Sequence, residues 1–343
     1  MRPPYWFGGR NCPMLDASIL SEFTGKRVLV TGGTGMIGRH VTHLLGNAQA
    51  KVTVVSLDNI RPDPRAEYLH ADLTNYEICR ELTQRKDFVF HLAGIKASME
   101  ISTTMVASHF VPTLMMNTNV LESCRVNQVG RVLYTSSIGA YEAESDFVEK
   151  ELGQFEGPPM DFAGWAKRMG ELQIAAYQKQ YGLKHFSIVR PSAVYGPGDN
   201  FDPTTAMVVP SLLAKIKTGE CVEVWGDGMA VRDIAFSEDV AEGLVLAILK
   251  GTNGYTNLGS GSGISIRELV FIMQEIVPFE FKFDPSKPSG KKQKLLDLKK
   301  AHSQLGYSPK TGLKAGLKKT WEWFNEYPFE HLQKMNYFNA DKN

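Results

Sequence analysis

The sequence has little of what marks secreted, metal-binding, membrane or nucleic-acid-binding proteins. Its four cysteines, Cys12, Cys79, Cys124 and Cys221, form no C-x-x-C pair, so neither a disulfide framework nor a zinc site is indicated. No apolar run reaches the roughly 18 residues that a transmembrane helix needs. The formal net charge of +1 gives no reason to expect nucleic acid or a membrane surface as a partner. We therefore expect a cytoplasmic globular protein without a metal site.

The feature that stands out instead is a glycine-rich turn between an apolar strand and an amphipathic helix. The predicted strand ends at Thr31, and the glycines follow it as Gly32-x-x-Gly35-x-x-Gly38. Glycines at this spacing allow a tight turn and let backbone N–H groups approach a pyrophosphate. They also let the helix pack closely on the sheet, with its N-terminus facing the anion. The turn therefore predicts a dinucleotide site.

A carboxylate ends the second predicted strand, at Asp58. At this distance from the glycines an acid would accept hydrogen bonds from an adenosine ribose. Because Asp58 would repel a 2′-phosphate, NAD is the predicted cofactor. Arg39 and Arg61 nearby leave NADP possible.

Strand and helix patterns alternate along the chain. Strands are predicted within 66–74, 87–94, 130–137 and 186–191, and long helices over about 103–127 and 162–181. This alternation predicts an α/β fold, a Rossmann-type doubly wound parallel sheet with ligands at its carboxyl edge. We expect the Rossmann domain at 26–194 plus 235–251, and a smaller C-terminal substrate-binding domain at 195–234 plus 252–335. Residues 1–25 lack the apolar core of a signal peptide and are expected to form an N-terminal arm, with a frayed tail as the alternative.

Some residues near the predicted strand ends have two interpretations. Asp72 and Leu73 would lie near the adenine, although Asp72 also suits a helix N-cap. Asn119 is either a cofactor contact or a solvated helix residue. Ala93 and Gly94 end a strand beside the glycine loop, where a larger side chain would collide with a dinucleotide.

Several short motifs follow one another in a fixed order. They are the glycine turn with Asp58, then Asp72-Leu73, His91-Leu92-Ala93-Gly94, Ser136-Ser137, Lys167 and Arg190-Pro191-x-x-Val194-Tyr195-Gly196-Pro197. As a set, over about 26–325, they resemble the extended short-chain dehydrogenase/reductase family, nucleotide-sugar epimerase/dehydratase type. The resemblance implies NAD(P)-dependent chemistry on a nucleotide sugar.

Two subgroups of that family are similar to different parts of the chain. The C-terminal half resembles the GDP-L-fucose synthases in Gly198-Asp199-Asn200-Phe201, Val224-Trp225-Gly226-x-Gly228, Arg232-Asp233 and Lys287-Pro288-x-Gly290. The N-terminal half resembles the UDP-galactose 4-epimerases in Leu57-Asp58-Asn59 and His91-x-Ala93-Gly94-x-Lys96. A GDP-sugar is the favoured substrate on the first likeness.

The resemblance also implies which residues bind the two ligands. Cofactor-binding residues would be Gly32, Thr34, Gly35, Met36, Ile37, Gly38, Asp58, Asp72, Leu73, Leu92, Ala93, Gly94, Lys96, Asn119, Lys167 and Arg190. Arg232 would clamp the substrate's diphosphate, because an arginine can bind it through two nitrogens. Trp225 either lines the same pocket or packs in the core, and Lys294 is the phosphate contact selected from a basic run that is otherwise a solvated face. A homodimer through the helices at 103–127 and 162–181 is expected.

The catalytic residues of this family include a serine and the motif Tyr-x-x-x-Lys, which transfers the hydroxyl proton of the sugar while hydride moves to or from the nicotinamide. Ser137 matches the serine, with Ser136 as the competing choice, and Lys167 matches the lysine, with a solvated helix lysine as the alternative. Counting back from Lys167 gives Ala163, so the expected tyrosine is missing. The explanations are an engineered Tyr→Ala substitution, which we favour, a natural pseudoenzyme, or relocation of the role to a group such as Tyr141. The chain is expected to bind both ligands and turn over poorly.

Other departures from the family narrow the reaction. The positions of the Asp-Glu pair of the dehydratases hold Ile138 and Gly139. Gly139 and Met207 also replace the cysteine and histidine with which GDP-L-fucose synthases epimerise C3 and C5. Redox chemistry at one carbinol, C4, remains, as a 4-epimerase or 4-dehydrogenase. An NADPH-dependent 4-keto-sugar-nucleotide reductase and a non-catalytic nucleotide-sugar or dinucleotide-binding protein are the alternatives.

Overall fold

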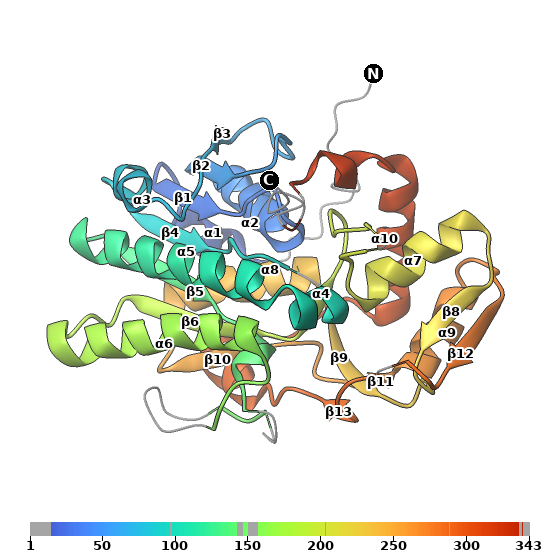
Figure 1. Ribbon diagram of the computed structural model, residues 1–343. Helices are drawn as coiled ribbons and strands as arrows, with labels where there is room; N and C mark the ends of the chain where they lie inside the picture. Colours follow the sequence, from blue (N-terminus) through green and yellow to red (C-terminus); the bar gives the residue numbers. More distant parts are fainter. Residues whose placement is uncertain are drawn as a thin grey trace.

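The computed structural model describes residues 15–96, 98–142, 147–149, 157–202, 204–287, 289–335 and 338. They form a large α/β part around one sheet and a smaller part beyond the strand ends (Figure 1). Residues 1–14 of the predicted N-terminal arm lie outside the described residues, and the arm's described end contains α1 (Ala17–Ser21). No helix within the described ranges is long and apolar enough to cross a membrane.

Seven parallel strands make the main sheet, in the order β10-β6-β5-β4-β1-β2-β3. Their bounds are β1 (Arg27–Thr31), β2 (Lys51–Ser56), β3 (Glu67–His70), β4 (Phe88–His91), β5 (Arg131–Thr135), β6 (Phe186–Pro191) and β10 (Tyr255–Leu258). The chain builds outward from β1 through β2 to β3 and then crosses to β4 on the other side. The order therefore reverses between β1 and β4, where doubly wound sheets bind their ligands. The predicted Rossmann-type fold is confirmed.

One strand of this sheet corrects a predicted domain boundary. Residues 252–335 were expected in the smaller domain, but β10 pairs in parallel with β6, with Tyr255 opposite Ile188. Conversely β7 (Ala193–Tyr195) begins within the predicted Rossmann range and pairs with β9 of the smaller part. Both pairings join segments far apart in the chain, which a local sequence pattern does not encode.

Helices cover both faces of the sheet, as a parallel sheet with buried apolar strands requires. One face packs against α2 (Met36–Asn47) and α8 (Ser237–Lys250), and the other against α3 (Tyr76–Thr83), α5 (Val106–Val126) and α6 (Phe162–Tyr181) (Figure 1). Asp161 caps α6 by accepting a hydrogen bond from the Gly164 N–H, and Gly182 ends the helix with φ 67°. The helix predicted over about 103–127 matches α5, and Met105, whose ψ of 48° is not helical, separates α5 from the short α4 (Met99–Thr104) before it.

The smaller part lies beyond the carboxyl edge of the sheet and has its own apolar core. In it β9 (Val231–Phe236) pairs with β7, β11 (Gly263–Ser265) and β13 (Gln293–Lys294), and β8 (Val222–Trp225) pairs with β12 (Phe281–Asp284). Its helices are α7 (Val208–Thr218), α9 (Ile266–Gln274) and α10 (Leu313–Glu326). The described residues of both parts also form short helical turns, which are η1 (Ile138–Ala140) after β5, η2 (Ala301–Leu305) and η3 (Glu330–Gln333).

Candidate active site

The glycine loop joins β1 to α2 with very little free space. Gly32 has φ 69°, and a Cβ there would stand 2.8 Å from the Ala93 Cα. A Cβ on Gly38 would stand 2.3 Å from the Gly32 carbonyl oxygen. Gly35 is the N-cap of α2 and provides no side-chain cap, so the first N–H groups of the helix are left to an external acceptor. An anion at this point would meet them and the positive end of the helix dipole.

Asp58 lies just beyond β2, beside the glycine loop. Its Oδ2 accepts a hydrogen bond from the Thr34 hydroxyl at 2.7 Å, and the same hydroxyl lies 2.7 Å from the Ser56 Oγ. Its Oδ1 accepts from the Met335 N–H at 2.9 Å. The structure therefore brings Asp58 and Thr34 together as predicted, and adds a contact from the C-terminal segment.

The loop after β3 is held by a residue from α5. The Asn119 side-chain amide donates to the carbonyl oxygens of Leu73 and Thr74, at 3.2 and 2.8 Å. Asp72 accepts from the Thr74 N–H at 2.9 Å, whereas the helix cap is Asn75. The N-cap interpretation of Asp72 is therefore wrong, and Asn119 fixes the loop rather than pointing its amide into solvent.

A buried polar chain that sequence reasoning missed runs from β1 to α6. Thr31 Oγ1 lies 2.8 Å from His91 Nδ1, His91 Nε2 lies 3.0 Å from Asn117 Oδ1, and Asn117 Nδ2 donates to the Ala166 carbonyl at 3.2 Å. Since Asn117 Oδ1 only accepts, His91 carries its proton on Nε2. Burial, with the nearby Lys167 charge, lowers the pKa of His91 to about 3, so the ring is neutral. The sequence signal that could have indicated this chain is the presence of polar residues at strand and helix positions that are predicted to be buried.

Lys167 is the best-defined group of the site. Its Nζ donates to the Thr135 carbonyl at 2.9 Å, and a Cβ on Gly94 would stand 3.3 Å from it. Burial lowers the pKa of Lys167 to about 8, and the charge of Glu171 opposes the shift. Lys167 is thus not a solvated helix lysine, because it spans from α6 to the ends of β4 and β5.

The two neighbouring serines have different surroundings. Ser136 is buried and its hydroxyl donates to a carboxylate oxygen of Glu171. Ser137 is half-buried, and its Oγ accepts from the Gly139 N–H at 3.0 Å. Gly164 of α6 packs so tightly on this turn that a Cβ would lie 2.1 Å from the Gly139 carbonyl oxygen. The start of α6, including Ala163, is thereby pressed against the Ser137 turn.

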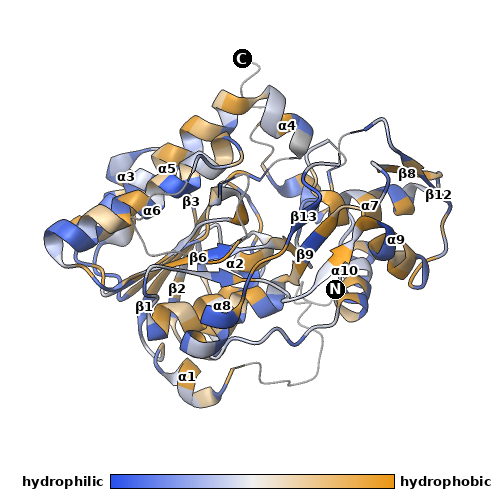
Figure 2. Ribbon diagram, turned by 90° about the horizontal axis from the view of Figure 1, so that it is seen from below, coloured by the Kyte–Doolittle hydropathy of each residue, from blue (hydrophilic) through white to orange (hydrophobic). Residues whose placement is uncertain are grey.

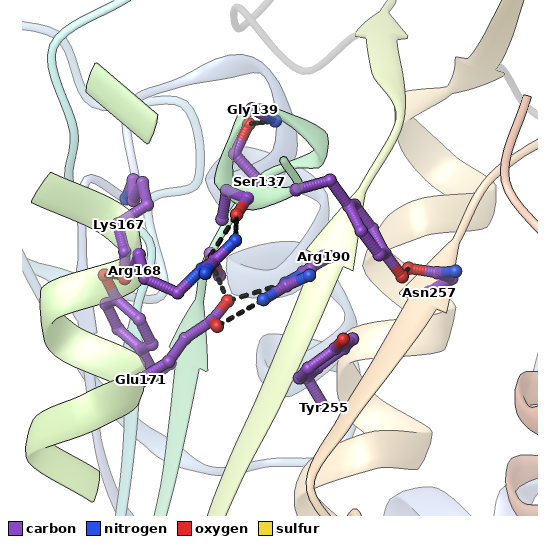
Figure 3. A network of polar contacts seen from close by, with 12 residues as sticks. Ser137, Gly139, Lys167, Arg168, Glu171, Arg190, Tyr255 and Asn257 are labelled. Carbon is purple, nitrogen blue, oxygen red and sulfur yellow. Dashed lines mark hydrogen bonds and ion pairs between the residues drawn. The ribbon is translucent and has the colours of Figure 1, made fainter. Parts of the chain in front are cut away.

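Two predicted residues belong to the core instead of the site. Arg190 has no exposed surface and binds Glu171 through two nitrogens, at 2.8 and 2.6 Å, with its guanidinium 3.6 Å from the centre of the Tyr255 ring (Figure 3). It therefore has no surface with which to meet a cofactor. Tyr141 is 1% exposed, donates to Asn257 Oδ1 at 2.9 Å, and burial raises its pKa far above the usual range. That environment is unsuited to proton exchange with a substrate.

Lys96 extends from the loop after β4 toward the smaller part. Its Nζ lies 2.9 Å from Asp199 Oδ1 and 3.4 Å from the Val194 carbonyl oxygen. The ion pair ties the loop after β4 to the connection between the two parts. In this arrangement the ammonium is engaged by the protein.

The predicted substrate residues lie on the smaller part. Arg232 and Lys294 are paired neighbours on β9 and β13, and burial together with the Arg232 charge lowers the pKa of Lys294. The Arg232 guanidinium donates to the carbonyl oxygens of Val231, Lys291 and Ser289 at 2.7 to 2.8 Å. Two cations side by side favour an anion. Trp225 stands on β8 in the separate two-stranded sheet and is part-exposed, so it is not a core residue.

The residues at the carboxyl edge fit a dinucleotide. The uncapped start of α2 suits a pyrophosphate, Asp58 suits ribose hydroxyls, and the small residues after β4 leave the way open to Lys167. Lys167 on α6 and Ser137 on the turn after β5 supply a cation and a hydroxyl to this edge, and Figure 3 draws both residues.

Comparisons with known proteins agree with this geometry. Residues 28–259 match the model of the NAD dependent epimerase/dehydratase family. A GDP-L-fucose synthase of Sinorhizobium fredii is 33% identical over 313 residues, covering 88% of this chain and 96% of the relative. A dTDP-4-dehydro-6-deoxy-D-allose reductase of Streptomyces sp is 30% identical over 323 residues, covering 88% of this chain and 97% of the relative. The structure of a Thermotoga maritima UDP-glucose 4-epimerase with UDP-glucose is similar at TM-score 0.79 and 29% identity, covering 88% of this chain and 99% of that one.

Proposed function

Because this chain belongs to the NAD dependent epimerase/dehydratase family, we propose that its site serves NAD-dependent oxidoreduction at C4 of a nucleotide sugar, as a 4-epimerase or 4-dehydrogenase. The observation that carries the proposal is the placement of Lys167, a half-buried cation bonded to the Thr135 carbonyl beside Gly94, at the edge that also holds the glycine loop. A lysine with only a structural role would not need to lie at the edge that holds the glycine loop. NAD is the cofactor of the family; when bound, it supplies the hydride acceptor.

Four groups of the chain would then act on the two ligands. The start of α2 binds the pyrophosphate, and Asp58 accepts from the adenosine ribose. Lys167 holds the nicotinamide ribose and lowers the pKa of a neighbouring hydroxyl through its charge. Ser137 donates a hydrogen bond to the sugar oxygen.

Ala163 stands where the proposed reaction needs a group that can transfer a proton. It lies one turn before Lys167 on α6, where the family motif has the acid–base tyrosine, and a methyl group moves no proton. Relocation of the role to Tyr141 has no support in that side chain's buried environment. We therefore propose that the chain is a low-activity Tyr→Ala form of the enzyme.

The decisive experiment restores the hydroxyl at position 163. Ala163→Tyr should raise turnover of a nucleotide sugar with NAD by roughly 10²- to 10⁴-fold, the usual contribution of a general acid–base. Ala163→Phe is the matched control, because it adds the ring without the hydroxyl and should stay at the level of the present chain. Equal activity of the two variants would contradict the proposal.

A second candidate function is supported by Ala163 itself. A non-catalytic protein that binds a sugar nucleotide or dinucleotide would need the glycine loop but no acid–base group. It predicts tight binding of both ligands and no gain of turnover in Ala163→Tyr with any nucleotide sugar. The 4-keto-reductase alternative predicts instead that NADPH binds more tightly than NADH and that a ketone is the substrate.

For the substrate we propose a GDP-sugar held through its diphosphate by Arg232 and Lys294. The paired positions of these two cations on β9 and β13 support the proposal. Arg232→Ala should weaken GDP-sugar binding by roughly 10- to 100-fold, because hydrogen bonds to charged groups contribute about 1.5–3 kcal/mol. Titration of GDP and of UDP under the same conditions tests whether the protein prefers guanine to uracil as the base.

We also propose a homodimer through α5 and α6. These helices lie side by side and carry exposed apolar side chains at Val111, Met115, Trp165, Met169 and Leu172. Figure 2 shows orange, hydrophobic segments along α5. A second copy of the same face would bury them. Met169→Glu should give monomers in sedimentation velocity, whereas Phe271→Glu, an equally exposed apolar position on α9, should not.

A cytoplasmic location of the protein stays a prediction.

A further inference from the structure

The C-terminal segment after α10 returns to the edge where the cofactor is proposed to bind. We define the C-terminal strap as residues 330–335 and Phe338. Within it Glu330 pairs with Arg39 of α2, and the Lys334 ammonium donates to the Gly198 carbonyl oxygen. Both contacts fix the strap beside the glycine loop, while the His331 ring lies against Phe201 and Phe324 of the apolar core of the smaller part.

The strap uses the carboxylate that the ribose would need. The Met335 N–H donates to Asp58 Oδ1 at 2.9 Å, while Thr34 donates to Oδ2 at 2.7 Å. Each oxygen of Asp58 thus already has a donor from the protein. The donor from Thr34 belongs to the glycine loop, whereas the donor from Met335 belongs to a separate segment.

The other end of the strap lies against α5. The Phe338 ring is 4% exposed and meets the His109 ring edge-on, with 6.0 Å between the ring centres. His109 Nε2 in turn lies 2.9 Å from the Ile95 carbonyl oxygen, in the loop that follows β4. The strap therefore contacts Asp58 beyond β2 directly and the loop after β4 only through His109, and β1 with its glycine loop stands between these two strands.

Much of the strap has little apolar contact with the body of the protein. Leu332 is 68% exposed and Met335 45%. Segments that bury few apolar groups open at low free energy. The strap is thus held mainly by polar contacts that a ligand with hydroxyl and phosphate groups would replace.

We propose that the C-terminal strap is an autoinhibitory element that occupies the dinucleotide edge and must leave Asp58 and His109 before a dinucleotide binds. The proposal rests on the dinucleotide site proposed above. Binding then measures two events, release of the strap and docking of the ligand, so the observed affinity falls by the fraction of molecules with the strap released.

The first test is hydrogen exchange on the intact chain with and without NAD. Peptides covering 330–335 should be protected in the free protein and should exchange at least several-fold faster when NAD saturates the site. The peptide covering Gly35–Leu45 should become more protected in the same sample. A strap that becomes more protected would be a lid over the ligand and would overturn the proposal.

The second test removes the strap. A chain truncated after Phe329 should bind NAD roughly tenfold more tightly by calorimetry, because one hydrogen bond to a charged group no longer has to break. Phe338→Ala should move affinity in the same direction, and Leu332→Ala, an exposed position in the same segment, should not. Retention of the thermal unfolding midpoint shows that α10 still folds. Unchanged or weaker binding by the truncated chain would contradict autoinhibition, whereas failure of every form to bind NAD would refute the proposed function itself.

Discussion

The two ends of the proposed cofactor edge are built in different ways. At the lysine end, Lys167 is fixed by the fold, since its ammonium donates to the Thr135 carbonyl beside Gly94. At the aspartate end, Asp58 is half-buried like Lys167, but one of its partners is Met335 of the exposed strap. The lysine end is preorganised, whereas the aspartate end can exchange partners.

The difference separates binding from chemistry. Recognition of the adenosine half depends on backbone N–H groups and one carboxylate near the surface, which tolerate exchange with water or with the strap. Proton transfer needs a charge held at one point, and burial provides that at a cost in stability. Changes at the two ends should therefore have different consequences.

The largest expected effect comes from the turn that serves the aspartate end. Gly38→Ala would place its Cβ 2.3 Å from the Gly32 carbonyl oxygen, and only movement of backbone can relieve this contact. We expect NAD affinity to fall by roughly 100-fold, from a distortion of about 1–3 kcal/mol. Gly46→Ala on the same helix is the control, since its Cβ meets the Arg65 side chain rather than backbone of the glycine turn. Calorimetric titration with NAD measures the affinity of both variants. Equal affinities would mean that the turn does not hold the ligand.

The next effect concerns cofactor choice at Asp58. Asp58→Asn keeps the shape and the acceptor for Met335 but removes the charge, so NAD should bind roughly tenfold more weakly. NADP should lose less affinity or gain some, because repulsion of its 2′-phosphate disappears. Asp87→Asn is the matched control, because Asp87 is also half-buried and accepts a backbone N–H, that of Arg27, but lies at the opposite edge of the sheet. A wild-type chain that prefers NADPH to NADH would reverse the role given to Asp58.

The smallest expected effect is the stability cost at the lysine end. The pKa of Lys167 is about 8 in the folded chain, below its usual 10.5, so the unfolded chain binds more protons between these values. Wild-type stability should therefore rise with pH from about 8 to 10.5 relative to Lys167→Met. At pH 7 the variant should be more stable by about 1 kcal/mol, since loss of the bond to Thr135 offsets part of the gain. Urea unfolding across this pH range measures the difference; a gap independent of pH would show that the fold does not lower the pKa of Lys167.

Predictions from sequence were most accurate where the signal is local. The helix over 162–181 matches α6, and the glycine turn with Asp58 lies as expected between neighbouring strands. Predictions from sequence were less accurate for contacts between residues that lie far apart in the chain. Arg190 was predicted at the cofactor because of its motif, but its charge is taken up by Glu171 on α6.

The Rossmann-type sheet, the glycine turn, the acid at Asp58 and the absence of a tyrosine before Lys167 can all be recognised in the amino-acid sequence. These features depend on periodicity and spacing within single elements. Folding in three dimensions was needed to reveal that β10 joins the main sheet, that His91 and Asn117 link β4 to α6, and that the strap reaches Asp58. Such pairings are set by which distant groups can satisfy one another once the core has formed, and neither partner carries that information in its own neighbourhood.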